Sequence, residues 1–144
     1  MTARGRRRES LVGRQLVLAR IARREAMAAL ADAIVKEENS ASLAERSAEM
    51  IRAYSRRREA QDGEDLRSQS RFLGSLGAIA EDAEAARRDA IDQTRWHVDT
   101  LAAAQTRADR LEKRDSQARK ARRAEAERKI AESAPAVPPR KARR

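Results

Sequence analysis

Apolar and small side chains recur along the first part of the chain at alternating steps of three and four residues. The series before residue 60 is Met27, Leu30, Ile34, Ala41, Ala44, Ala48 and Ile51. This spacing returns each side chain to the same face of an α-helix and is typical of the seam of a coiled coil. Glu37 interrupts the series, and the opposite face is charged.

A second series of this kind follows residue 60. It begins with Phe72, Leu76, Ile79, Ala83, Ala86 and Ala90, and it continues from Ile91 through Val98, Leu101, Ala108 and Leu111. Between Ala90 and Ile91 the pattern shifts by one position, which indicates a stutter that locally changes the supercoil. Two long helices with apolar seams are therefore expected, one on each side of residue 60.

Glycine and proline predict where the chain reverses. All three prolines lie in the last ten residues, so the preceding chain can hold very long helices. The best turn signal in the middle is Gln61–Asp65, because Gly63 can adopt a positive φ without steric cost in a tight Asp-Gly reversal. A break inside the first helix at Lys36–Ser40 is an open alternative, since Ser42 and Glu45 have capping-box spacing.

These signals predict an all-α fold, a long antiparallel two-helix coiled-coil hairpin. We expect the hairpin to occupy residues 1–134 with its tip near residues 61–66, and residues 135–144 to form a disordered basic tail. Each arm would then be about 50 residues long, or ~75 Å at 1.5 Å per residue.

The composition supports this expectation and excludes several classes of protein. The 144 residues are 39% charged and 2% aromatic, and the apolar residues are mostly alanine, which suits long helices better than the thick core of an α/β enzyme. Cysteine is absent, which excludes disulfides and thiolate metal sites. The sequence shows no secretory signal and no apolar stretch of bilayer length, so we expect a cytoplasmic protein.

Charge is concentrated at the two ends of the chain. Residues 1–24 carry a net charge of +7 and residues 102–144 carry +8, whereas residues 25–65 carry −4 and residues 66–101 carry −1. A reversal near the middle would bring both basic segments to the same end of the hairpin.

The sequence offers no catalytic constellation. His97 is the only histidine, and pairs such as Glu37-Glu38 point in different directions on a helix, so we expect no enzyme activity, metal or cofactor. Gly74 and Gly77 are too close together for a phosphate-binding loop, and their place in an apolar seam predicts close contact with a neighbouring backbone.

The chain resembles the FliJ family of flagellar type III protein export, which is related to the YscO-like proteins of injectisomes. The resemblance covers residues 11–130 and depends on the Arg- and Ala-rich segment 16–31, the spacing Phe72-x-x-x-Leu76-x-x-Ile79, and the segment 107–114. It implies a non-enzymatic stalk similar to the central subunit of rotary ATPases. Such a stalk would couple an export ATPase hexamer to the export gate and bind export chaperones, in the cytoplasm and peripheral to the inner membrane.

The resemblance also implies two contact sites. The cytoplasmic domain of the export gate would contact Phe72, Leu76, Ile79 and Ala83. The ATPase ring would contact the basic ends, which we assign to Arg14, Arg20, Arg23, Arg24, Arg110 and Arg114. The alternative to partner contact is that Phe72, Leu76 and Ile79 fill the seam against Met50, Ile51 and Tyr54.

Two other functions are consistent with the sequence. An injectisome stalk would have the same shape and charge as a flagellar one. A basic coiled-coil protein that binds nucleic acid would use the arginine runs to neutralise phosphates. No aromatic residues are interleaved with those runs to stack on bases, so nucleic acid is not the expected partner.

Overall fold

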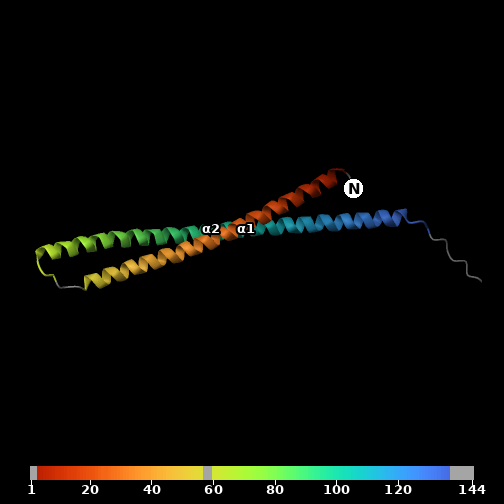
Figure 1. Cartoon of the computed structure of the whole chain (residues 1–144). Helices are drawn as coiled ribbons and strands as arrows, with labels where there is room; N and C mark the ends of the chain where they lie inside the picture. The colour runs from red at the N-terminus through yellow and green to blue at the C-terminus, as the bar shows by residue number, and fades with distance from the viewer. Residues whose placement is uncertain (1–2, 57–59, 137–144) are drawn as a thin grey trace, which may run out of the picture. The chain divides into compact units, whose positions relative to one another are not determined.

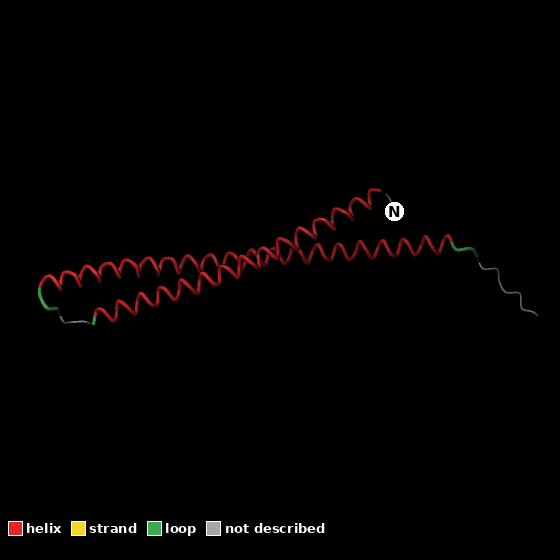
Figure 2. Tube along the Cα trace, in the orientation of Figure 1, coloured by secondary structure: helices red, strands yellow, loops and turns green. Residues whose placement is uncertain are grey.

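Two long helices dominate the part of the chain that the computed structural model describes, residues 3–56 and 60–136. Helix α1 spans Ala3–Ser55 and helix α2 spans Gly63–Ser133, and the two run antiparallel (Figures 1 and 2). The predicted all-α hairpin is confirmed. Most of the predicted basic tail, residues 137–144, lies outside the described residues.

Contacts divide the chain into two units, each built from a piece of α1 and a piece of α2. We call Met1–Ala22 with Gln105–Arg144 the terminal unit, and Arg23–Ala104 the turn unit.

Helix α1 passes through Lys36–Ser40 without interruption, so the break considered from the sequence does not occur. No proline or glycine lies in this stretch, and a hydroxyl group close to it can find a partner that a continuous helix provides. The Ser47 hydroxyl, for example, donates a hydrogen bond of 2.8 Å to the carbonyl oxygen of Leu43, one turn earlier.

The start of α2 is fixed by an aspartate cap. The backbone N–H of Asp65 donates a hydrogen bond of 2.7 Å to Asp62 Oδ1, and Asp65 Oδ2 accepts a bond of 3.1 Å from the backbone N–H of Gln61. This reciprocal pattern is close to a capping box. Gly63 is therefore the first residue of the helix, and no glycine among the described residues has a positive φ, so the predicted left-handed role of Gly63 is wrong.

In the turn unit, the side chains between the helices follow an unbroken alternation of three and four residues. Every member of this seam is buried or half-buried. On α1 the seam consists of Arg23, Ala26, Leu30, Ala33, Glu37, Ser40, Ala44, Ser47, Ile51 and Tyr54. On α2 it consists of Leu73, Leu76, Ala80, Ala83, Arg87, Ala90, Thr94, His97, Leu101 and Ala104.

One hydrogen bond fixes the register of the two helices in this unit. The Thr94 hydroxyl donates to the carbonyl oxygen of Ala33 at 3.4 Å, as well as to that of Ala90 in its own helix at 3.0 Å. Continuing this antiparallel register places Leu30 opposite His97 and Ile51 opposite Leu76.

The predicted seam was correct at some positions and displaced by one residue at others. Leu30, Ala44, Ile51, Leu76, Ala83 and Ala90 belong to the seam. Met27 and Ile34 are instead exposed, and the smaller Ala26 and Ala33 are buried in their place. Alanine allows the two helices to approach closely, which leaves the larger side chain beside each alanine outside.

The predicted stutter at Ile91 is also wrong. Burial passes from Ala90 to Thr94, His97 and Leu101 in the same frame, whereas Val98 is exposed. The sequence pattern missed this continuity because Thr94 and His97 are polar, although both occupy seam positions.

In the terminal unit, Leu16 and Ala19 of α1 pack against Ala108 and Leu111 of α2, and Ala108 is completely buried. Two ion pairs across the helices accompany this small core. Arg20 Nη2 lies 3.2 Å from Glu112 Oε1, and Arg122 Nη1 lies 3.2 Å from Glu9 Oε1. Exposed pairs of this kind add at most about 1 kcal/mol each, so the apolar contacts dominate.

Neither helix, within the residues that the structure describes, contains a segment both long and apolar enough to cross a lipid bilayer.

Candidate functional site

One side of the terminal unit carries basic and apolar residues but no acidic residue. The Arg20–Glu112 ion pair lies on one flank of the seam, and each partner immediately follows a seam residue. Residues that immediately precede a seam residue lie on the other flank. We call the surface formed by these preceding residues the acid-free face. It comprises Arg4, Arg8, Leu11, Gln15 and Leu18 of α1, and Arg107, Arg110, Arg114, Gln117, Ala121, Ala124 and Arg128 of α2, all of them exposed.

The acidic residues of the terminal unit are directed elsewhere and are largely engaged. Glu9 and Glu112 pair with arginines across the helices, and Asp115 Oδ2 lies 3.1 Å from Arg119 Nε within α2. Asp109 accepts a hydrogen bond of 3.0 Å from Gln105. The arginines of the acid-free face form no ion pair with another described residue, so their charge is available to a partner.

Two exposed leucines lie among these charges. Leu11 is 55% exposed and Leu18 is 65% exposed. A surface that combines guanidinium groups with aliphatic side chains can bury apolar area against a protein while pairing with its carboxylates.

The opposite flank of the terminal unit has a different chemistry. A groove of about 370 Å³ lies there, and it is lined by four basic and two acidic side chains. It is lined by Leu16, Arg20, Glu112, Asp115, Ser116, Arg119, Lys120 and Arg123. Because acidic and basic groups are interleaved along it, this groove presents no field of a single sign.

The six arginines predicted to contact an ATPase ring do not form one cluster. Arg110 and Arg114 lie on the acid-free face. Arg14 and Arg20 belong to the same unit but lie off that face, and Arg20 is occupied by Glu112 through two hydrogen bonds of 3.3 and 3.2 Å. Arg23 and Arg24 belong to the turn unit, where Arg23 is half-buried in the seam.

The four residues predicted to contact an export gate are divided between the inside and the outside of the turn unit. Leu76 and Ala83 are buried in the seam, at 6% and 4% exposure. Phe72 and Ile79 are 42% and 52% exposed, so only these two present a surface to a partner. Each of them immediately precedes a seam residue, as do the exposed Leu43 and Met50 on α1. We call Leu43, Met50, Phe72 and Ile79 the Phe72 flank.

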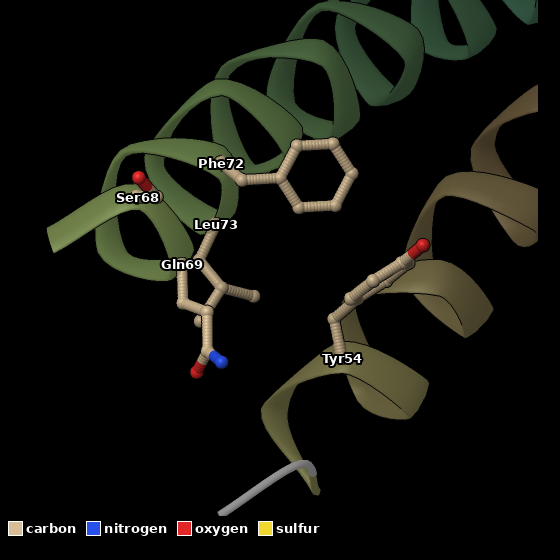
Figure 3. A pocket seen from close by; sticks show the side chains of 5 residues that line it. All are labelled: Tyr54, Ser68, Gln69, Phe72 and Leu73. Carbon is tan, nitrogen blue, oxygen red and sulfur yellow. The ribbon is translucent and has the colours of Figure 1, made fainter. Parts of the chain in front are cut away.

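Phe72 is held in place by an aromatic contact near the connection between the helices. Its ring meets that of Tyr54 edge to face, with centroids 4.8 Å apart and an interplanar angle of 71°. Figure 3 shows the two rings facing each other from α2 and α1, beside a cavity of about 220 Å³ that Ser68, Gln69 and Leu73 complete. Of the expectation that Phe72, Leu76 and Ile79 fill the seam, the contact of Phe72 with Tyr54 and the burial of Leu76 are confirmed. Phe72 and Ile79 instead lie beside the seam, and 42% of Phe72 stays exposed.

No cluster of three or more His, Cys, Asp or Glu side chains suited to a metal ion occurs in the described ranges 3–56 and 60–136. His97 is half-buried in the seam, and its ring meets that of Trp96 edge to face at 4.8 Å. Glu37 is half-buried between the helices, whereas Glu38 is exposed. These positions are explained by helix packing.

Comparison of the chain with models of protein families, with curated proteins and with solved structures finds no match in any of the three.

The acid-free face does not emerge when charge is counted by segment rather than by helical position. The signal was present in the spacing of Arg107, Arg110 and Arg114, which recur at steps of three and four. Reading that spacing against the frame of Ala108 and Leu111 would have placed the three arginines together on one side.

Proposed function

We propose that this protein is a non-enzymatic helical stalk of a type III protein export apparatus, which binds an acidic surface of the export ATPase hexamer through the acid-free face. The flagellar apparatus is the preferred setting, and an injectisome is the alternative with the same physical requirements. The site of action would be cytoplasmic and peripheral to the inner membrane.

The observation that carries this proposal is the concentration of positive charge in the terminal unit. That unit holds 20 Lys and Arg against 7 Asp and Glu, a net charge of +13, and the turn unit holds 13 against 16, a net charge of −3. Basic groups gathered on one face raise the rate of association with an acidic partner and orient the encounter. Leu11 and Leu18 supply apolar contact once the partner has docked.

An acidic protein surface suits this face better than nucleic acid does. The three aromatic residues of the chain, Tyr54, Phe72 and Trp96, all belong to the turn unit, so the basic face has no ring on which a base could stack. Leucine side chains gain little from contact with a phosphate backbone.

The Phe72 flank is the proposed contact for a second partner, the cytoplasmic domain of the export gate, and export chaperones are further proposed partners. Four large apolar side chains, Leu43, Met50, Phe72 and Ile79, are exposed together there. The buried Leu76 and Ala83 would support this surface from within without touching the partner.

The proposal for the acid-free face is tested by reversing charges on and off that face. Arg110→Glu with Arg114→Glu should weaken binding to the purified export ATPase hexamer by about tenfold or more, which corresponds to 1.4 kcal/mol. Lys113→Glu with Lys120→Glu changes the net charge by the same amount on exposed positions off the face, and should change the affinity by less than about twofold. Equal losses in both variants would refute a specific face, and no binding by the unmodified chain would refute the proposed function.

The contact with the gate is tested separately. Phe72→Ala with Ile79→Ala should abolish capture of the cytoplasmic gate domain, while circular dichroism stays helical. Val17→Ala with Val35→Ala removes similar exposed apolar area away from both proposed surfaces and serves as the matched control. Retained capture by the Phe72 flank variant would exclude that flank as the contact.

A further inference from the structure

The turn unit exposes a second apolar flank, on the side of the seam opposite to the Phe72 flank. Met27, Ile34, Ala41 and Ala48 of α1 each immediately follow a seam residue, and so do Gly77, Glu84, Ile91 and Val98 of α2. Glu84 is half-buried at the end of this flank nearer the connection, and its carboxylate lies 3.0 Å from Arg87 of its own helix. In an antiparallel pair such positions border the same groove, as Arg20 and Glu112 do in the terminal unit. We call the six apolar residues Met27, Ile34, Ala41, Ala48, Ile91 and Val98 the Ile34 flank.

Large side chains on this flank remain substantially exposed. Met27 is 55%, Ile34 is 42% and Val98 is 48% exposed, and the other three are half-buried or border the seam. No large side chain among the described residues is fully buried anywhere, because the seam between the two helices consists mainly of alanine. A pair of helices with so thin a core gains stability when its apolar flank is covered by further helices.

The edges of the Ile34 flank carry opposite charges. The edge on α1 is formed by Glu38, Glu45 and Arg52, and the edge on α2 is formed by Glu81, Arg88 and Arg95. All six are exposed, and none of them pairs with another described residue.

The order of these charges makes the flank complementary to itself. Along the same direction, the α1 edge reads acidic, acidic, basic, while the α2 edge reads basic, basic, acidic. A two-fold axis parallel to the helices places α1 of one copy over α2 of the other and preserves the axial register. Two residues that face each other between copies then have numbers with the same sum as two residues that face each other between α1 and α2 of one copy.

Seam residues that face each other have numbers that add up to 127, as Ala33 and Thr94 do. Side chains lean toward the N-terminus of their own helix, so long side chains that pair between antiparallel helices have numbers that add up to more than this. In Arg20–Glu112 the residue numbers add up to 132, and in Glu9–Arg122 they add up to 131. Between two copies, Glu38 with Arg95, Glu45 with Arg88 and Arg52 with Glu81 all give 133. Three opposite-charge pairs therefore form on each side of the interface. In the other face-to-face arrangement, with α1 against α1 and antiparallel, no register pairs all three charged residues of an edge with opposite charges. The register that pairs Glu38 with Arg52, for example, brings Glu45 against Glu45 of the second copy.

We propose that the Ile34 flank is a homodimer interface, in which two copies of the turn unit associate about a two-fold axis parallel to the helices to form a four-helix bundle. The apolar residues of both flanks form the new core, and the complementary edges select the parallel arrangement over the antiparallel one. This inference uses neither the acid-free face nor the Phe72 flank and is independent of the proposed function.

Sedimentation equilibrium of the full chain tests the interface. The unmodified protein should form a dimer in a concentration-dependent manner, and Ile34→Glu with Val98→Glu should make it monomeric, because each dimer would bury four unpaired carboxylates. The matched control is Val35→Glu with Ala78→Glu, which adds the same charge at exposed positions on the outer faces and should leave the dimer intact. A monomer at every concentration, or equal effects of the two variants, would overturn the proposal.

Charge exchange tests the complementarity without altering an apolar residue. Glu38→Arg with Glu45→Arg should weaken the dimer about tenfold or more, and adding Arg88→Glu with Arg95→Glu to the same chain should restore it. Failure of the four-residue exchange to restore a dimer lost in the two-residue variant would exclude these edge contacts. Since all six edge residues are exposed, the helical content should be equal in all variants.

The relative orientation of the two copies is tested by cross-linking. The chain has no native cysteine, so only introduced thiols react. Chains carrying Glu45→Cys and chains carrying Arg88→Cys, mixed and treated with a short bifunctional thiol reagent, should yield the mixed dimer. Each variant alone should yield little product. Efficient linking of Glu45→Cys chains to each other would show that α1 faces α1 and would contradict the proposed axis.

Discussion

Small residues decide which larger residues meet a partner in this protein. Ala26 and Ala33 occupy the seam, and the adjacent Met27 and Ile34 are exposed as a result. A ranking of residues by hydrophobicity alone chooses methionine and isoleucine as the core, which is why the sequence analysis placed them there. In a pair of helices the closest approach favours alanine, so the bulkier side chains form flanks that remain open to other helices.

Gly74 and Gly77 of α2 can each be replaced by a residue with a side chain. An added Cβ at Gly74 or Gly77 meets no atom within 4 Å, so the close backbone contact expected from the sequence is wrong. Gly74→Ala and Gly77→Ala should each raise the free energy of unfolding by up to about 1 kcal/mol, because alanine loses less backbone entropy in a helix. Thermal unfolding followed by circular dichroism measures this, and a lower melting temperature would contradict it.

The cap at the start of α2 depends on a single side chain, that of Asp62. Asp62→Ala removes the acceptor for the backbone N–H of Asp65 and should cost about 1 kcal/mol, whereas Asp62→Asn should preserve most of the stability. Urea unfolding distinguishes the two substitutions. Equal stability of Asp62→Ala and the unmodified chain would mean that water replaces the cap without loss.

At the scale of the helices, the positions of Leu76 and Ile79 relative to the seam predict different losses of stability when each is replaced by alanine. Leu76→Ala should destabilise the hairpin by about 2 kcal/mol or more, because Leu76 is 6% exposed and its removal leaves a cavity. Ile79→Ala should cost less than about 0.5 kcal/mol, because Ile79 is 52% exposed. Denaturant titration of both variants gives the comparison, and a larger loss for Ile79 would show that the frame is wrong.

The elements themselves were predictable because their signals are long and consistent. Two helices, one reversal and the antiparallel arrangement follow from the many helix-forming residues and from the position of the prolines. The assignment of individual residues to the seam did not follow from these signals. Thr94, His97 and Arg87 are polar residues in seam positions, and a search for apolar residues skipped them and shifted the pattern to Ile91. Of the candidate contact residues, the sequence could not separate Phe72 and Ile79 from the buried Leu76 and Ala83.

At the scale of the whole molecule, the charge is divided between units of opposite sign, +13 and −3. This division predicts how the chain behaves towards duplex DNA. Binding at low ionic strength should be independent of sequence and should fall by about 10³-fold or more between 50 and 200 mM salt, as expected for several phosphate contacts and no base recognition. Fluorescence anisotropy with two unrelated duplexes measures both properties, and a sequence preference that survives at 200 mM would favour the nucleic-acid alternative.

The uneven distribution of large side chains along the seam of the turn unit determines what holds the two helices in step. From Ala33 to Ser47 the facing positions carry mostly alanine and serine, and the exceptions are Glu37, Arg87 and Thr94. A displacement by one heptad, about 10.5 Å, would bring small residues opposite each other again only at Ser40 with Ala80 or at Ala44 with Ala90, and it would break the hydrogen bond from Thr94 to Ala33. Ile51 and Tyr54, which meet bulky partners on α2 close to the connection, have no such equivalent position. The bulky contacts near the connection and the hydrogen bond from Thr94 to Ala33 therefore hold the small-residue stretch at both of its ends, and the two helices of the turn unit cannot slide past each other without breaking one of them.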